Sequence, residues 1–172
     1  MRRLMLMRHA KSDWSVAGQH DHERPLSARG RKAAPMMGLY MAQHRLIPDA
    51  VLVSTAVRTQ ATWNLVAPTL DRRIEPRFDR GLYGAAAAEL LAAVRKTAPA
   101  VHALLVIGHN PGLQDLARLL IESGDADARL ALMEKFPTAA LAVIDFPVTR
   151  WSDVAPRGGR LERFIAPRML EK

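Results

Sequence analysis

The sequence predicts an α/β fold, a three-layer sandwich with a mostly parallel central sheet between two layers of helices. Three apolar runs, at residues 4–7, 51–53 and 104–107, are continuous rather than alternating, which is typical of strands that are covered on both faces. Segments with the spacing of amphipathic helices separate these runs. Because strand and helix alternate along the chain, most of the strands are expected to pair in parallel.

The helices of this fold are indicated by apolar residues that recur three or four positions apart, at 33–41, 57–65, 90–94 and 113–120. Pro35 falls inside the first of these patterns, where it should kink the helix or mark a late start. The alanine run at 85–88 is expected to begin a helix. Two further strands are predicted at 140–146 and 161–165.

Two helix starts lie where strands end, which is where polar residues gather. Asn110 before Pro111 predicts a capping residue followed by proline at the first helical position. Ser54 or Thr55 is expected to cap the helix that carries Arg58. Anions bind at such places in α/β proteins, because free backbone N–H groups and the helix dipole point there.

Composition narrows the class of protein. A chain of 172 residues with ordinary apolar and charged content is expected to form one domain over residues 1–172. It contains no cysteine, which excludes disulfides, thiolate catalysis and cysteine-bound metals. The run at 4–7 is too short for a secretion signal, and no apolar run approaches the roughly 20 residues that span a bilayer. We therefore expect a cytoplasmic protein without a membrane partner.

The formal net charge of +8 favours an anionic partner, since a positive field attracts phosphate, nucleic acid and acidic surfaces alike. The basic residues are scattered singly and in pairs, and aromatic residues are not interleaved with them as on a base-stacking surface. A nucleic-acid partner is therefore not expected.

Two histidines directly follow predicted strands. His9 comes after the first strand, and His109 comes after the strand at 104–107. Ligands of open α/β sheets bind at the carboxyl ends of the strands, so the two histidines are expected to meet there. With Arg8 and Arg58 beside them, they would form a cationic pocket suited to a phosphoryl group.

Four short motifs contain most of these polar residues. They are Arg8-His9-Ala10-Lys11-Ser12-Asp13-Trp14, then Arg24-Pro25-Leu26-Ser27 with Gly30, then Ser54-Thr55-Ala56 with Arg58, and Gly108-His109-Asn110-Pro111-Gly112. In this order and spacing the set resembles the histidine phosphatase superfamily, and within it the short SixA-type phosphohistidine phosphatases. The similarity extends from Leu4 to about Phe146 and implies a phosphoglycerate mutase-like fold.

The resemblance implies a two-step transfer in which His9 attacks phosphorus, becomes a phosphohistidine and is then hydrolysed by water. A histidine nucleophile must be neutral, with one ring nitrogen free. The resemblance also implies His109 as a second catalytic residue and Arg8, Arg58 and Arg24 as ligands of the phosphate. Phosphoryl transfer mainly needs positioning and positive charge around the equatorial oxygens. This scheme requires no metal and no other cofactor.

One departure from the family pattern concerns the general acid. Mutases and many phosphomonoesterases of the superfamily carry a glutamate three residues before a tyrosine in the middle of the chain. Here Tyr83 is preceded at that distance by Arg80, and the nearest candidate acids are Asp79 and Glu89. An alkoxide usually needs a proton donor to leave, whereas an N-linked group leaves more readily. The departure favours phosphohistidine or a related phosphoramidate as the substrate.

Some residues allow more than one interpretation. Lys11, Ser12 and Asn110 either reach the phosphate or only shape their loops. The polar segment at 20–22 has residue types that bind metals, but no further ligand lies nearby in the sequence, and an exposed loop is expected.

The short interval between Arg58 and His109 leaves no room for a lid domain, so the pocket is expected to be open. The predicted partner is a phosphorylated protein or a small phosphorylated substrate, with the oligomeric state left open. Two alternatives stay open as well. One is a small-molecule phosphomonoesterase or mutase-like enzyme of the same superfamily, and the other is a non-catalytic module that binds phosphate or a polyanion.

Overall fold

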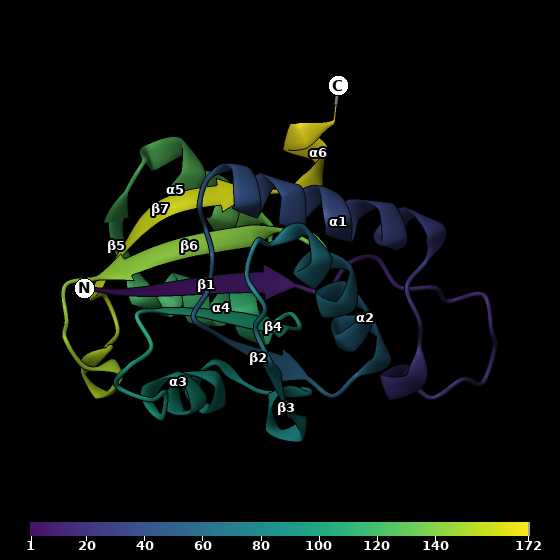
Figure 1. Cartoon of the computed structure of the whole chain (residues 1–172), viewed down its shortest axis with the longest axis horizontal. Coiled ribbons are helices and arrows are strands. Elements are labelled where there is room, and N and C mark those ends of the chain that lie inside the picture. The colour runs from purple at the N-terminus through teal and green to yellow at the C-terminus, as the bar shows by residue number, and fades with distance from the viewer. Residues whose placement is uncertain (172) are drawn as a thin grey trace.

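A computed structural model describes residues 1–171 and has a seven-stranded sheet with helices on both faces (Figure 1). The strands are β1 (Arg2–Arg8), β2 (Ala50–Ser54), β3 (Pro76–Asp79), β4 (Ala103–Gly108), β5 (Ile121–Gly124), β6 (Leu141–Phe146) and β7 (Gly159–Ile165). Their order across the sheet is β3-β2-β4-β1-β6-β7-β5. Within the described residues, β6 alone runs antiparallel to its neighbours. The predicted α/β class and mostly parallel sheet are confirmed.

The helices are α1 (Ala28–Gln43), α2 (Val57–Val66), α3 (Ala87–Arg95), α4 (Gly112–Leu120), α5 (Ala126–Glu134) and the short α6 (Pro167–Leu170). Successive residues of a strand point to opposite faces of a sheet. Accordingly, Met5 and Met7 of β1 join a buried cluster with α1 and α2, whereas Leu4 and Leu6 join another with α3, α4 and α5. The three predicted layers are confirmed, and they explain why the run at 4–7 is apolar throughout.

The predicted elements occur, with one correction near Pro35. The helix α1 begins at Ala28, where the Ser27 hydroxyl accepts the N–H of Gly30 at 3.1 Å. Pro35 therefore lies inside the helix, and the alternative of a late start is wrong. The strands β3 and β5 and the helices α5 and α6 were not predicted.

The two predicted caps at the strand ends are also corrected. Ala56 occupies the cap position of α2, because β2 continues through Ser54 and the Ser54 hydroxyl bonds elsewhere. Pro111 occupies the cap position of α4, one residue later than predicted. Asn110 still satisfies a free N–H of that helix, because its side-chain oxygen accepts from the Gln114 amide at 3.2 Å.

The loop after β1 is held against the start of α1. The Lys11 carbonyl accepts the Ser27 N–H at 2.8 Å, and Ser12 pairs with Leu26. A Cβ at Gly30 would clash with the Lys11 carbonyl, so only glycine lets the helix approach so closely. This contact fixes the loop that carries Lys11 and Ser12.

Within residues 1–171, no helix combines the length and the apolar character that crossing a bilayer would require.

Candidate active site

The register of the sheet places the two histidines side by side. The strands β1 and β4 are parallel neighbours in which Arg8 lies opposite Gly108, so His9 and His109 follow at the same edge. Their ring centroids are 5.3 Å apart, and the residues are only 6% and 9% exposed. The expectation that the histidines meet across the sheet edge is confirmed.

A cavity of about 240 Å³ opens beside these rings. It is lined by Arg8, His9, Lys11, Ser12, Trp14, Arg58, His109, Asn110 and Thr138. The structure therefore brings four of the five predicted site residues to one cavity, together with the three residues of open role. Within the described chain, the cavity wall contains three Arg or Lys side chains and no carboxylate, so it suits an anion.

Hydrogen bonding defines the protonation of His9. The Nδ1 atom of His9 lies 2.7 Å from the Ala10 carbonyl oxygen. Because a carbonyl only accepts, Nδ1 carries the proton and donates, which leaves Nε2 with a free lone pair. Burial lowers the pKa of His9 to about 4, and Arg58 and Arg8 contribute to the shift. At neutral pH the His9 ring is therefore uncharged and nucleophilic.

His109 is oriented by two neighbours. Its Nδ1 accepts from the Arg58 guanidinium at 3.4 Å, so Nε2 carries the proton and donates to the Ser54 hydroxyl at 2.7 Å. Burial, followed by His9 and Arg58, lowers the pKa of His109 to about 3. A dianion in the cavity would oppose this shift, because a nearby negative charge raises the pKa of a histidine.

Arg58, at the start of α2, is buried and bonded to a carboxylate from another segment. Its guanidinium donates to the Asp21 carbonyl at 2.7 Å and to the Asp21 carboxylate at 2.9 Å. The Tyr83 hydroxyl donates to the same carboxylate. These contacts hold the pKa of the Asp21 carboxyl below its usual value, with Tyr83 the larger cause. Asp21 is therefore ionised at neutral pH.

Arg8 is tied by fewer contacts than Arg58. Its guanidinium donates to the Phe136 carbonyl at 3.0 Å, and its Nε is buried without a partner among the described residues. Burial, and then the charge of Arg58, lower the pKa of Arg8. Two guanidiniums thus lie close enough to repel each other, and an anion between them would relieve that repulsion.

Arg24 lies beside the cavity rather than in its wall. Its guanidinium stacks 4.0 Å from the centre of the Trp14 ring, and Trp14 itself lines the cavity. The structure thus separates Arg24 from the other four predicted site residues, although one aromatic ring connects them. Its role as a phosphate ligand stays a prediction.

The carboxylates near the site are not those that the sequence indicated. Asp79 accepts the Gly81 N–H at 2.8 Å, and Glu89 accepts the Ala86 N–H at 3.1 Å, so both cap their own helices. Asp21, in the single helical turn η1 (Asp21–Glu23), reaches Arg58 instead. It lies in the segment predicted to be an exposed loop, and its side chain is indeed 45% exposed. Within residues 1–171, no group of three His, Asp or Glu side chains could hold a metal ion.

Comparisons with known proteins agree with this arrangement. Residues 4–94 match the model of the histidine phosphatase superfamily (branch 1). An uncharacterized protein of Mycobacterium tuberculosis is 37% identical, over 94% of this chain and all of its own length. Among solved structures, a protein of Agrobacterium tumefaciens provisionally named SixA phosphohistidine phosphatase is 28% identical, with a TM-score of 0.80 over 96% of this chain and 99% of its own. A similarly named protein of Nakamurella multipartitia is 29% identical, with a TM-score of 0.80 over 96% of each chain.

Proposed function

Since this chain belongs to the histidine phosphatase superfamily and is a phosphatase of the SixA type, we propose that it hydrolyses phosphate from phosphohistidine on a protein or from a related phosphoramidate. In this proposal the phosphoryl group is first transferred to His9 of the enzyme, which becomes a covalent phosphohistidine intermediate. One observation carries the proposal. The neutral His9 ring, with Nε2 free, borders a small cationic cavity that Arg8, Arg58 and His109 share.

In the first step, Nε2 of His9 attacks phosphorus, and a P–N bond forms as the bond to the leaving group breaks. Arg8 and Arg58 stabilise the negative charge on the equatorial oxygens. Because His9 has its proton on Nδ1, bonded to the Ala10 carbonyl, the attacking nitrogen needs no base to deprotonate it.

In the second step, water attacks the phosphorus of phosphorylated His9. The P–Nε2 bond breaks, its electron pair returns to the ring, and inorganic phosphate leaves. His109 is suited to hold the Arg58 guanidinium beside the ring of His9, because its Nδ1 accepts from that guanidinium. Splitting one hydrolysis into two displacements lowers each barrier.

The ionised state of Asp21 supports the proposed substrate class. This carboxylate is the one nearest to the cationic groups, yet its lowered pKa keeps it ionised in the free enzyme. An alkoxide leaving group would lack a proton donor, whereas the ring of a phosphohistidine titrates near neutrality and can take its proton from solvent. N-linked phosphate is therefore the substrate that this site serves best.

The mechanism is tested by rapid quenching with a ³²P-labelled phosphoramidate, followed by mapping of the acid-labile label. We expect the label on His9, and a matched variant of a remote histidine, His44→Ala, should label normally. Label on another residue, or turnover without any labelled enzyme, would overturn the covalent mechanism.

The substrate class is tested by comparing kcat/KM on a phosphohistidine peptide, an aryl phosphate and a phosphoserine peptide of matched sequence. The phosphohistidine peptide should be the best substrate and the phosphoserine peptide the worst. The small-molecule phosphomonoesterase would replace our proposal if an alkyl ester were preferred and Asp21→Asn suppressed that activity selectively.

The cytoplasmic location and the organisation of residues 1–172 as one domain stay predictions, and Lys172 lies outside the described residues. The partner we propose is a phosphorylated protein.

A further inference from the structure

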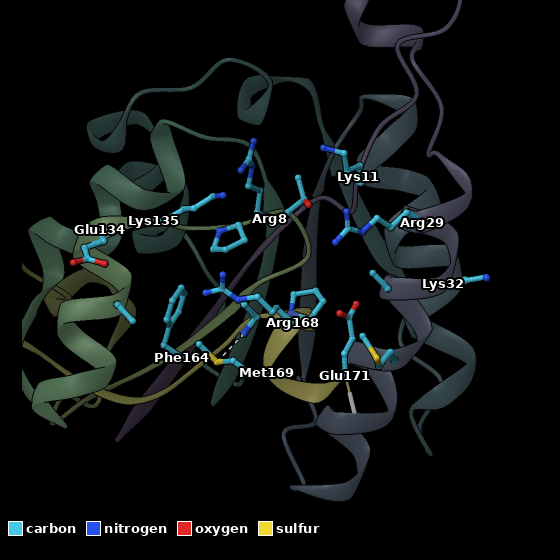
Figure 2. Close-up of a pocket in the computed structure, with 17 residues that line it drawn as sticks. Arg8, Lys11, Arg29, Lys32, Glu134, Lys135, Phe164, Arg168, Met169 and Glu171 are labelled. Atoms are coloured by element: carbon cyan, nitrogen blue, oxygen red, sulfur yellow. Dashed lines mark hydrogen bonds between the residues drawn. The ribbon is translucent and has the colours of Figure 1, made fainter.

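A second and larger cavity adjoins the first. It has a volume of about 750 Å³ and lies between α1, the end of α5 and α6 (Figure 2). Arg8, Lys11 and Thr138 line both cavities. Because the two share these wall residues, a ligand held in the larger one, hereafter the basic groove, would lie next to the smaller one, hereafter the phosphoryl cavity.

The groove is strongly positive. Six cationic side chains line it, but only two carboxylates do. The cations are Arg8, Lys11, Arg29, Lys32, Lys135 and Arg168, and the carboxylates are Glu134 and Glu171. The cations come from separate elements. In Figure 2 the Arg29 guanidinium points into the groove from α1, and the Arg168 side chain extends from α6 toward Phe164.

These cations are not neutralised by the protein itself. Within residues 1–171, none of the six cations takes part in an ion pair. By contrast, Arg58 in the phosphoryl cavity has Asp21 as a partner. Like charges that face one cavity repel each other, and an anionic ligand would remove that repulsion.

The groove also has an apolar part. Met36, Phe164 and Met169 line it between the cations, along with Pro137 and Pro167. A compact anion would use only one or two of the dispersed charges. An extended peptide presents side chains at regular intervals to both the charges and the apolar surface between them.

We propose that the basic groove binds an acidic polypeptide segment that flanks the phosphorylated residue of the substrate protein. This inference rests on the proposed function for the identity of the partner. The acidic side chains pair with Arg29 and Arg168, and the phosphorylated residue enters the neighbouring cavity past Arg8 and Lys11.

Binding is measured first, without any reaction. The probe is a fluorescein-labelled peptide of alternating glutamate and alanine without phosphate, and the readout is fluorescence anisotropy at low ionic strength, where screening is weak. Reversing both charges in Arg29→Glu/Arg168→Glu should weaken binding by at least about fivefold. The control, Arg77→Glu/Lys96→Glu, makes the same change in net charge at exposed positions on β3 and after α3, and should leave binding nearly unchanged.

Turnover is measured second, on phosphohistidine peptides with acidic or neutral flanks and on free phosphoramidate. The wild type should prefer the acidic peptide, mainly through KM. The groove variant should lose this preference and keep its activity on phosphoramidate, which also shows that it folds.

The possible results separate the two proposals. The groove assignment is overturned if the acidic peptide fails to bind, or if the groove variant and the control variant bind it equally well. This conclusion does not depend on which substrate the enzyme hydrolyses. Tighter binding of inorganic triphosphate or of an RNA oligonucleotide than of the peptide overturns it too. Peptide binding that depends on the groove, without cleavage of any N-linked phosphate, supports the groove and overturns the proposed reaction.

Discussion

The phosphoryl cavity and the basic groove are both cationic, but their charges are held in different ways. In the phosphoryl cavity Arg58 is 7% exposed and bonded to Asp21 and His109. In the groove, Arg29 and Arg168 are exposed, and neither forms an ion pair within residues 1–171. Buried charges are fixed in place and shift the pKa of their neighbours, whereas exposed charges act through a field that salt weakens. Substitutions in the cavity should therefore alter chemistry, and substitutions in the groove should alter recognition.

The sharpest separation of the two regions is expected from His9→Ala. Removing the proposed nucleophile should reduce kcat by about a thousandfold or more, because the covalent route would be lost. Steady-state kinetics on a phosphoramidate would measure the loss, and circular dichroism would verify the fold. A folded variant that retains its activity would remove His9 from the mechanism.

Arg58→Ala is expected to have the next largest effect. The loss of one fixed cation at the transition state should lower kcat/KM by about 10²- to 10³-fold. It should also weaken inhibition by inorganic phosphate more than Arg24→Ala does, because Arg24 stacks on Trp14 outside the cavity wall. Equal inhibition constants in the wild type and Arg58→Ala would contradict the assignment.

The pH dependence of stability tests whether burial really keeps the histidines neutral. The pKa of His109 is lowered to about 3 in the folded protein, below its usual value of about 6.5. Below about pH 6.5 the His109 ring therefore binds a proton in the unfolded chain but not in the folded one. Folding stability is lost as the pH falls through this range. Relative to His109→Gln, the free energy of unfolding of the wild type should fall by up to about 1.4 kcal/mol more per pH unit between about pH 6 and 4.

Denaturant titrations of both proteins at several pH values would measure this difference. If the free energy of unfolding changed with pH in the same way in both proteins, His109 would be readily protonated in the folded state. That result would contradict the view that groups buried in the cavity have shifted pKa values.

A smaller effect is expected from Asp21→Asn. The Asp21 carboxylate and a bound phosphate compete for the Arg58 guanidinium, so removing its charge should tighten inhibition by phosphate. A pair with one exposed partner is worth less than about 1 kcal/mol, which limits the gain to about fivefold. Inhibition kinetics would measure it, with Asp79→Asn as a control at a carboxylate that caps η3 (Arg80–Leu82). Weaker inhibition would show that Asp21 instead orients Arg58 for the substrate.

Local sequence was sufficient to predict the centre of the fold and the meeting of the two histidines. The runs that became β1, β2 and β4 are apolar at every position because helices cover both faces of the sheet. His9 and His109 each directly follow one of these strands, and parallel neighbours end at the same edge. These features depend on residues that are adjacent in the chain, so periodicity and motif spacing record them.

The sequence did not indicate the strands β3 and β5, the role of Asp21 or the basic groove. At the sheet edges, short strands such as β3, with its exposed Arg77 and Phe78, lack the continuous apolar pattern of covered strands. Asp21 and Arg58 are far apart in the sequence, and their contact exists only because the loop before α1 folds over the start of α2. The groove likewise assembles α1, α5 and α6 from distant parts of the chain. Tertiary packing alone decided these features, since no local pattern records which charges a folded chain will bring together or leave unpaired.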